Sequence, residues 1–448
     1  MKLRYIFLLL ALLFANTTKA QQLTANMKAA FDDLIDTRYK ADEPGGVVLI
    51  AQNGSILYQR AFGMSDVEEH VKMQADMLFN IGSQTKQFTA VRILQLAEQG
   101  KLSVTDHLSK DIDHCPLIWQ NITIENLLTH SSGISDLRGK GGLPLAARID
   151  TAMIRPLAFQ PGTKTFYANI EFEILGYIIE RITGESMAVN LVKYIIDPLG
   201  LKHTYAMAGD VAVPGRISGY IKRADGHFSK GELYEGNAGG AGGLISNTKD
   251  IMAWYEALAN GRVIKKETLA KAWKPYKLAD GQFSKYGYGW DAGGDVQGHP
   301  IAEHGGLIVG FSTESLYLID EHIYVGVFLN QRSYADATAQ ELAAIALAQP
   351  YPAQSMQLSE QALQAFAGTY ADDTGNKKQF NLRNGKLYYE PQGAQPLQLM
   401  PYAKNKFYLE NTLVVADIIH DVQGKVLAIK FSDRRFSGQP GWQWNKTE

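Results

Sequence analysis

The spacing of apolar residues along this chain predicts several amphipathic helices. In the clearest of them, from residue 86 to 97, apolar side chains return about every 3.6 positions, and Gly100 ends the pattern. A second long apolar helix runs up to Gly184, and glycine is a common helix terminator. The same spacing predicts helices over residues 23–39 and 335–349.

Shorter apolar runs predict strands on both sides of this helical region. Residues 47–51 and 56–59 flank Asn53-Gly54, a pair that favours a two-residue hairpin turn. Apolar runs over residues 307–313 and 324–329 are typical of buried strands. The pattern therefore indicates a mixed domain of helices and strands, and by itself it leaves the order of the strands in the sheet open.

The pattern changes after Pro350-Tyr351-Pro352, where a second domain is expected. One short helix is predicted at residues 358–366, and Asn384-Gly385 then separates two apolar runs, which again indicates a hairpin. Its apolar side chains fit a core, and a ligand-binding cup is the alternative. Strands are predicted at residues 379–383, 386–389, 406–409, 413–419 and 425–431. We divide the chain into residues 21–349, a linker at 350–356 and a small antiparallel domain at 357–448.

Residues 1–20 have the three parts of a secretory signal peptide. Met1-Lys2-Leu3-Arg4 is basic, an apolar run ends at Ala15, and Thr18-Lys19-Ala20 ends in a small residue suited to cleavage. The apolar run is short for a bilayer span, and an uncleaved anchor is the alternative. We expect a chain that begins near Gln21, has no membrane span and acts in the periplasm or outside the cell.

Composition argues against several classes of function. The net charge is −2, from 44 basic and 46 acidic residues, which gives no electrostatic basis for nucleic-acid binding. The single cysteine, Cys115, excludes an intrachain disulfide. The chain has neither an H-E-x-x-H zinc motif nor a glycine-rich phosphate loop, and His203, His299 and His322 lack the spacing of metal ligands.

Ser83-Gln84-Thr85-Lys86 is the strongest candidate for nucleophilic chemistry. Residues three apart share a helix face, so the Lys86 amine can reach the Ser83 hydroxyl and accept its proton. Gly82 lets the chain turn into the helix, whose first N–H groups would face a developing oxyanion. A helix cap is the alternative for Ser83. A second S-x-x-K tetrad begins at Ser246, which is predicted to be a helix N-cap.

Two further motifs follow in the chain. Tyr167-Ala168-Asn169 comes after the turn Pro161-Gly162, and a phenol near an ammonium can have its pKa lowered enough to carry protons. His304-Gly305-Gly306 begins a strand with little side-chain bulk, as expected where backbone approaches a ligand. Taken alone, one tyrosine among 22 or one histidine would be structural.

In this order the three motifs resemble those of the serine β-lactamase and penicillin-binding-protein superfamily, in the branch of class C β-lactamases, D-alanyl-D-alanine carboxypeptidases, D-aminopeptidases and related esterases. Residues 127–134, 242–246 and 286–290 also look like family segments, so the resemblance covers residues 25–345. It implies an α+β fold, an antiparallel sheet flanked by helices with a helical insert and the site at the seam. The C-terminal domain resembles the lipocalin-like β-barrel appended to some of these hydrolases.

The resemblance also implies roles for individual residues. Ser83 would be the acylated nucleophile, with Lys86 and Tyr167 as the proton-transfer network. The backbone N–H groups of Ser83 and Leu307 would form the oxyanion hole, and no metal or organic cofactor is implied. Substrate-binding roles are implied for Asn169, His304 and Gly306.

His304 bears on substrate choice. Family members that bind substrate carboxylates typically have Lys-Thr-Gly here, and histidine is only partly charged near neutral pH. We therefore expect a serine hydrolase of small esters or D-amino-acid amides and peptides, of esterase, D-aminopeptidase or D,D-carboxypeptidase type. A β-lactamase is the alternative within the enzymes. A non-catalytic binder of peptidoglycan or D-amino-acid peptides is the alternative outside them, against which the intact Ser83, Lys86 and Tyr167 argue.

Overall fold

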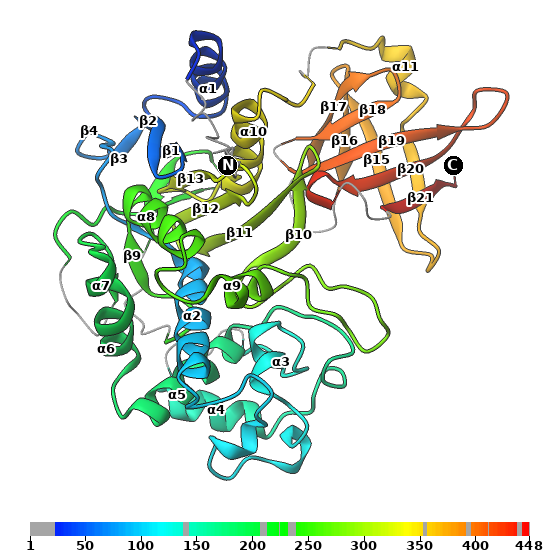
Figure 1. The fold of residues 1–448 in the computed structure, drawn as a ribbon. Helices are drawn as coiled ribbons and strands as arrows, with labels where there is room; N and C mark the ends of the chain where they lie inside the picture. Colours follow the sequence, from blue (N-terminus) through cyan, green and yellow to red (C-terminus); the bar gives the residue numbers. More distant parts are fainter. Residues whose placement is uncertain are drawn as a thin grey trace, which may run out of the picture.

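Strands from both ends of the main domain form one six-stranded antiparallel sheet (Figure 1). Its members are β1 (Gly46–Gln52), β2 (Ser55–Phe62), β10 (Asp291–Val296), β11 (His299–Ile308), β12 (Phe311–Leu318) and β13 (Ile323–Leu329). Their order in space is β10-β11-β12-β13-β1-β2, so the N-terminal hairpin pairs with the strands that follow the helical region. This sheet and its helical insert confirm the predicted α+β fold.

The computed structural model describes residues 23–137, 143–206, 213–223, 225–231, 239–352, 356–390, 396–410, 412–436 and 441–447. The predicted signal peptide, residues 1–20, and part of the predicted linker lie outside these ranges. Within these ranges, no helix combines the length and the apolar character needed to cross a membrane.

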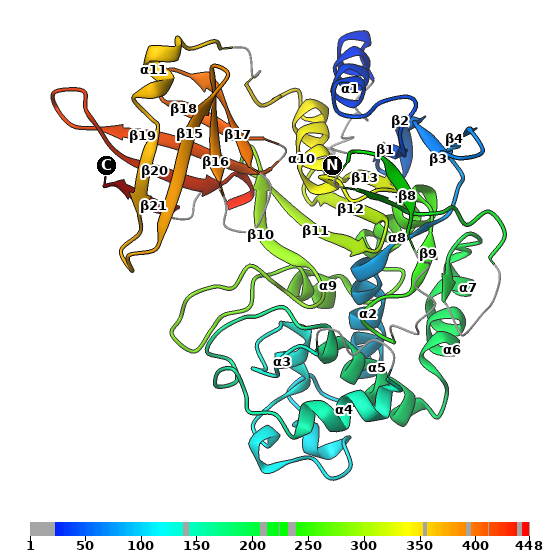
Figure 2. The ribbon, with the colours of Figure 1, turned by 180° about the vertical axis from the view of Figure 1, so that it is seen from behind.

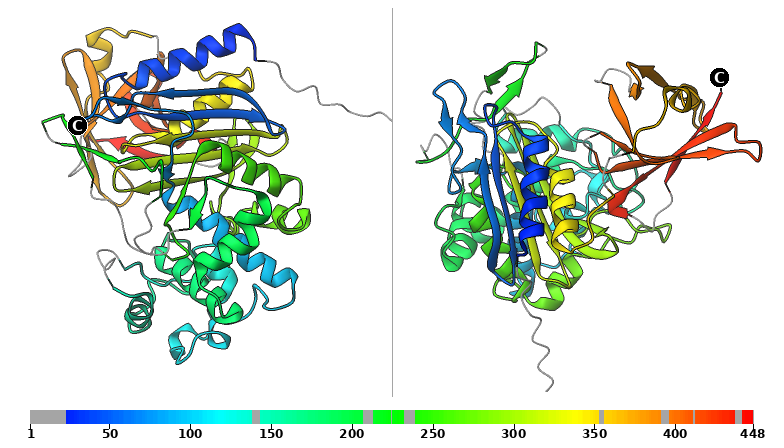
Figure 3. Two further views of the ribbon diagram at one scale, coloured as in Figure 1. Left: turned by 90° about the vertical axis from the view of Figure 1, so that its left-hand side faces the viewer. Right: turned by 90° about the horizontal axis from the view of Figure 1, so that it is seen from above.

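Helices cover both faces of the sheet. Successive strand residues point to opposite faces, so Val48 belongs to one buried cluster and Leu49 to the other. Figures 1 and 3 show one helix pair on the upper face of the sheet, and Figure 1 shows the second pair below it. The upper pair is α1 (Ala25–Arg38) and α10 (Ala335–Ala346), and the lower pair is α2 (Thr85–Glu98) and α8 (Thr248–Ala259).

In the sequence, a helical insert separates the N-terminal strands of the sheet from its C-terminal strands. Its longest helix, α5 (Asn169–Thr183), packs against α2 and ends at Gly184 with φ +71°, as the apolar pattern predicts. Other helices are α3 (Ile124–Leu128), α4 (Leu145–Met153), α6 (Met187–Leu191), α7 (Asp197–Leu199) and α9 (Lys266–Ala272). Short strands are β3 (Met64–Asp66), β4 (Val71–Lys72), β5 (Phe79–Asn80), β6 (Tyr205–Ala206), β7 (Tyr220–Lys222), β8 (Phe228–Lys230) and β9 (Leu244–Ser246).

The predicted cap of α8 is wrong by one residue. Asn247 is the N-cap, because its side chain accepts the Asp250 N–H at 2.9 Å. Ser246 ends β9 instead and exchanges a 2.8 Å hydrogen bond with the Thr204 hydroxyl. Asparagine and serine are equally good N-caps, so capping preference alone does not choose between Asn247 and Ser246. Because β9 pairs with β5 and β6 up to Ser246, the helix begins one residue later.

The C-terminal domain is a closed antiparallel barrel of eight strands, which confirms the predicted barrel-like domain (Figure 2). Asn384 and Gly385 both have positive φ in its predicted hairpin turn. Phe380 packs on Phe431 and Tyr389 inside the barrel, so these side chains form a core. The elements are α11 (Glu360–Gln364), β14 (Gly368–Ala371), β15 (Lys377–Arg383), β16 (Lys386–Glu390), β17 (Leu397–Ala403), β18 (Lys406–Leu409), β19 (Val414–His420), β20 (Val426–Asp433) and β21 (Trp442–Lys446).

The barrel contacts the main domain through the turn after β20. Arg434 donates to Glu341 of α10 at 3.2 Å, and Arg435 lies 3.5 Å from Glu303 of β11. The Lys285 amine lies 4.0 Å from the centre of the Phe436 ring. These contacts bring an arginine of the barrel domain next to β11 of the six-stranded sheet.

Gly289 offers a test of the packing that holds α2 in place. Its φ is +84°, and a Cβ there would lie 2.7 Å from the Ala90 Cβ and 3.1 Å from the Lys86 carbonyl oxygen. We expect Gly289→Ala to destabilise the protein by about 1–3 kcal/mol more than a glycine-to-alanine change without such contacts, because the added methyl overpacks the helix. Urea denaturation of the two variants measures this difference.

Gly281→Ala is the matched control. Gly281 has φ +87°, and a Cβ there would meet nothing within 4 Å, so this variant carries the backbone strain without the clash. Equal shifts of the denaturation midpoint in both variants would contradict the packing argument.

Candidate active site

Ser83 lies in a tight turn against the edge of β11. The turn is a short 3₁₀ helix, Gly82–Gln84, that leads directly into α2. Gly82 has φ +52°, and a Cβ there would lie 3.2 Å from the Leu307 backbone nitrogen. A Cβ on Gly306 would lie 1.9 Å from the Ile81 carbonyl oxygen. Two glycines therefore let the strand backbone approach the turn, which brings the Leu307 backbone close to Ser83.

The Lys86 amine is completely buried and hydrogen-bonded on three sides. Its Nζ lies 3.1 Å from the Ser83 Oγ, 2.8 Å from the Asn169 Oδ1 and 2.7 Å from the Ala241 carbonyl oxygen. These three oxygens come from the 3₁₀ turn before α2, from the first residue of α5 and from the loop before β9. The predicted S-x-x-K contact and the predicted Y-x-N motif thus meet at one nitrogen.

Burial gives Lys86 the protonation behaviour of a base. It lowers the pKa of the amine to about 7, and the carboxyls of Glu173, Asp136 and Glu171 only partly oppose this. Near neutral pH a large fraction of the amine is therefore unprotonated. An unprotonated amine 3.1 Å from a serine hydroxyl can accept its proton.

Tyr167 shares the site but differs electrostatically from the sequence prediction. Its side chain lines the same cavity as Ser83, and the Lys86 Nζ lies 4.8 Å from the centre of its ring. Although 42% of the residue is exposed, its hydroxyl end is crowded, and burial raises the phenol pKa instead of lowering it. Tyr167 is therefore a neutral donor near neutral pH, because burial disfavours its phenolate.

His304 is neutral and both of its ring nitrogens are occupied. The Nδ1–H donates to the Gly305 carbonyl oxygen at 2.6 Å, so Nε2 accepts from the Tyr286 hydroxyl at 2.8 Å. Burial, aided by Lys86, lowers its pKa to about 3. The sequence analysis expected a histidine that is partly charged near neutral pH. In the structure the pKa of His304 is too low for that, so the ring is uncharged.

The predicted site residues share one cavity. It has a volume of about 770 Å³ and is lined by Ser83, Tyr167, Asn169, His304, Gly306 and Leu307, with Lys86 behind Ser83. The individual roles of these residues stay predictions. Among the described residues, no three His, Cys, Asp or Glu side chains are grouped to hold a metal ion.

Sequence reasoning missed the carboxyl groups on the wall of this cavity. Asp291, Glu314 and Asp336 line it together with Arg332 and Arg435, so carboxyls outnumber guanidinium groups. The sequence held a signal, because Glu314 is the single charged residue in the run Phe311–Leu318. Arg435 had no such signal, because it comes from the barrel domain.

Burial sets the charge of this wall. It raises the pKa of Glu314 well above its ordinary value, and the carboxyls of Glu303, Asp336 and Asp291 add to this. It also raises the pKa of Asp291 to about 6, against the opposing effect of Arg435. A cation that enters the cavity would favour the ionised forms of these groups.

Comparison with known proteins gives consistent results. The chain is 28% identical over 417 residues to Penicillin-binding protein 4* of Bacillus subtilis (strain 168), covering 86% of this chain and 92% of that protein. It is 28% identical over 349 residues to the D-aminopeptidase of Gluconobacter oxydans (strain 621H), covering 74% of this chain and 64% of that enzyme.

A solved structure shows the same fold. The octameric penicillin-binding protein homologue from Pyrococcus abyssi superposes with a TM-score of 0.68 at 23% identity, covering 94% of this chain and 99% of that one. Residues 29–349 match the sequence model of the family described as Beta-lactamase. With the serine, lysine and tyrosine of the three motifs gathered around one cavity, this chain belongs to the Beta-lactamase family and is a serine hydrolase.

Proposed function

We propose that this enzyme hydrolyses small D-amino-acid amides and esters, preferring substrates that carry a free amine and lack a carboxylate. The observation that carries the proposal is the cavity beside Ser83, where a neutral His304 lies next to a carboxyl-rich wall. The resemblance to a D-aminopeptidase supports the same substrate class. The signal-peptide pattern of residues 1–20 supports the further proposal that the enzyme acts in the periplasm or outside the cell.

The first chemical step is acylation of Ser83. The unprotonated Lys86 amine accepts the hydroxyl proton while the Ser83 Oγ attacks the substrate carbonyl carbon. The carbonyl oxygen becomes an oxyanion, which the backbone N–H groups of Ser83 and Leu307 stabilise in this proposal. Collapse of this intermediate breaks the bond to the leaving amine or alcohol.

The leaving group and the acyl-enzyme each need one proton transfer. Tyr167, a neutral phenol in the same cavity as Ser83, donates to the departing nitrogen or oxygen and regains its proton from Lys86. Water then attacks the acyl carbon and gives its proton to the same network. The carboxylic acid leaves, and Ser83 regains its hydroxyl.

Electrostatics of the cavity favour ammonium over carboxylate groups. A neutral His304 offers no positive charge, and an anion would face more carboxyls than guanidinium groups, because Asp291, Glu314 and Asp336 line the cavity with Arg332 and Arg435. A substrate ammonium would face the same carboxyls with the favourable sign. We therefore expect faster hydrolysis of aminopeptidase, amidase and ester substrates than of β-lactams or of peptides whose C-terminal carboxylate must be bound.

Ser83→Ala should abolish turnover. We expect the rate of D-alanine p-nitroanilide hydrolysis to fall at least about 1000-fold, because no other group at the cavity replaces the nucleophile. Labelling by a fluorophosphonate should be lost as well. Ser246→Ala, in the second S-x-x-K tetrad, is the matched control and should keep its activity. Turnover or labelling that persists in folded Ser83→Ala would rule out the mechanism.

The pH dependence should follow Lys86. Only the unprotonated amine accepts the Ser83 proton, so kcat/KM for p-nitrophenyl acetate should rise with pH and level off above about pH 7, the pKa of Lys86. This ester has no titratable group of its own. Rates corrected for spontaneous hydrolysis measure the profile. A profile that is flat through neutral pH and rises only near the ordinary lysine pKa would contradict the role of burial.

Glu314→Gln should weaken the preference for a free amine. We expect kcat/KM for D-alanine p-nitroanilide to fall about tenfold, whereas that for N-acetyl-D-alanine p-nitroanilide stays within about threefold, because only the former carries an ammonium group. The acetylated substrate therefore serves as the internal control. Equal changes for both substrates would contradict recognition of the ammonium by this wall.

A further inference from the structure

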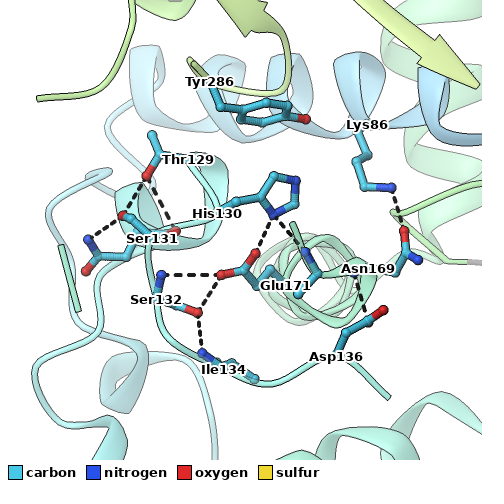
Figure 4. Close-up of polar contacts among 12 residues, drawn as sticks. Lys86, Thr129, His130, Ser131, Ser132, Ile134, Asp136, Asn169, Glu171 and Tyr286 are labelled. Atoms are coloured by element: carbon cyan, nitrogen blue, oxygen red, sulfur yellow. Dashed lines mark hydrogen bonds and ion pairs between the residues drawn. The ribbon is translucent and has the colours of Figure 1, made fainter. Parts of the chain in front are cut away.

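A buried histidine–glutamate pair lies directly behind the Y-x-N motif (Figure 4). His130 follows α3 and is 2% exposed, and Glu171 lies in the first turn of α5 and is 1% exposed. The His130 Nδ1 hydrogen-bonds to the Glu171 Oε2. The Glu171 Oε1 accepts the Ser132 hydroxyl at 2.5 Å and the Ser132 N–H at 3.3 Å. Hydrogen bonds to both carboxyl oxygens therefore fix the orientation of the imidazole.

The same segment holds the backbone on both sides of Tyr167. The His130 carbonyl oxygen accepts the Phe166 N–H at 2.9 Å, and the His130 Nδ1 lies 3.4 Å from the Ala168 nitrogen, whose N–H points at it. Asp136, six residues further along, accepts the Asn169 N–H at 3.0 Å. Tyr167 thus lies between two backbone contacts that both belong to His130.

The imidazole also packs against the aromatic side chains of the site. Its centre lies 4.4 Å from the Tyr167 ring and 4.6 Å from the Tyr286 ring. Figure 4 shows the imidazole between Glu171 and Tyr286. Tyr286 in turn donates to the His304 Nε2, so the packing continues from α5 to β11. His130 has φ +54°, an uncommon conformation for a non-glycine residue, which the surrounding contacts must stabilise.

Physical chemistry indicates that the pair is uncharged. Burial lowers the pKa of His130 well below its ordinary value, and the nearby Lys86 and His304 add to this. Burial also raises the pKa of Glu171 well above its ordinary value, against the hydrogen bonds from Ser132. The proton therefore stays on Glu171, which donates to Nδ1. The Ala168 N–H directed at that nitrogen fits an Nδ1 without a hydrogen of its own.

We propose that His130 and Glu171 form a positioning pair that holds Tyr167-Ala168-Asn169 in its catalytic conformation. The inference rests on the proposed roles of Ser83 and Tyr167, because the pair touches neither Ser83 nor the cavity lining except through this motif. Neither residue takes part in proton transfer. Their hydrogen bonds set where the Tyr167 hydroxyl and the Asn169 amide lie relative to Lys86.

Two pairs of variants separate this role from simple packing. His130→Asn keeps an acceptor near the position of Nδ1, and Glu171→Gln keeps a donor to Nδ1, whereas His130→Leu and Glu171→Met remove them. We expect the last two to lower kcat about 10- to 100-fold with KM within about threefold, because ground-state binding does not need an oriented Tyr167. The conservative variants should recover kcat to within about fivefold.

The coupling to Tyr167 is tested in a double-mutant cycle. If the pair acts through Tyr167, His130→Leu should lower kcat by less than about threefold in the Tyr167→Phe background. This loss would be much smaller than the loss that His130→Leu causes in the wild-type enzyme. Every rate is divided by the concentration of active sites titrated with a fluorophosphonate, so partial unfolding does not count as lost catalysis. His299→Asn and Glu321→Gln, in a His–Glu pair with an Nδ1–Oε1 distance of 2.5 Å outside the cavity lining, are the controls and should leave kcat unchanged.

The outcomes are distinct. Full additivity in the cycle, or wild-type kcat in His130→Leu, would overturn the positioning role while leaving Ser83 chemistry intact. If His130→Leu fails to fold, Glu171→Gln against Glu171→Met decides, and equal losses of kcat in these two would overturn the role.

Discussion

The active site depends on one buried amine. The Lys86 Nζ is withdrawn from solvent, and such a group is stable only when protein atoms replace its hydrogen bonds to water. Its three oxygen partners, from Ser83, Asn169 and Ala241, lie on segments far apart in the sequence. The fold must therefore bring these segments together to bury the amine, and the burial that results gives Lys86 a pKa suited to accepting a proton.

A second constraint is the close approach of strand and turn. Gly82 and Gly306 leave no side chain between the α2 turn and β11, so backbone meets backbone there. The helical insert completes the site from the other side, because α5 begins at Asn169 and its first turn carries Glu171. The seam between sheet and insert is thus a rigid frame, and groups aimed at a developing oxyanion need such a frame.

We propose that the charges around this frame govern substrate choice. Burial keeps His304 neutral, and its ring nitrogens are occupied by a hydrogen bond donated to the Gly305 carbonyl oxygen and one accepted from the Tyr286 hydroxyl. Glu314 and Asp291 supply carboxyls to the same cavity. Arg435 reaches this wall from the barrel domain. The barrel therefore forms part of the active-site cavity, and its arginine offsets some of the acidic charge that would otherwise face a substrate.

The sequence by itself determined the helices α1, α2, α5, α10 and α11, the hairpins at Asn53-Gly54 and Asn384-Gly385, and the motif residues around Ser83, because periodicity, turn chemistry and short motifs are local properties. It missed β14, β17 and β21, whose short, polar or proline-containing runs become strands only by pairing around the barrel. It also missed β10, and the apolar run 307–313 is not one strand, because a turn at Gly310 divides it between β11 and β12. The neutral state of His304, the raised pKa of the Tyr167 phenol, the carboxyl wall and the His130–Glu171 pair were decided by the tertiary structure. A charge or a pKa depends on burial and on neighbours distant in sequence, and only the folded chain brings those neighbours together.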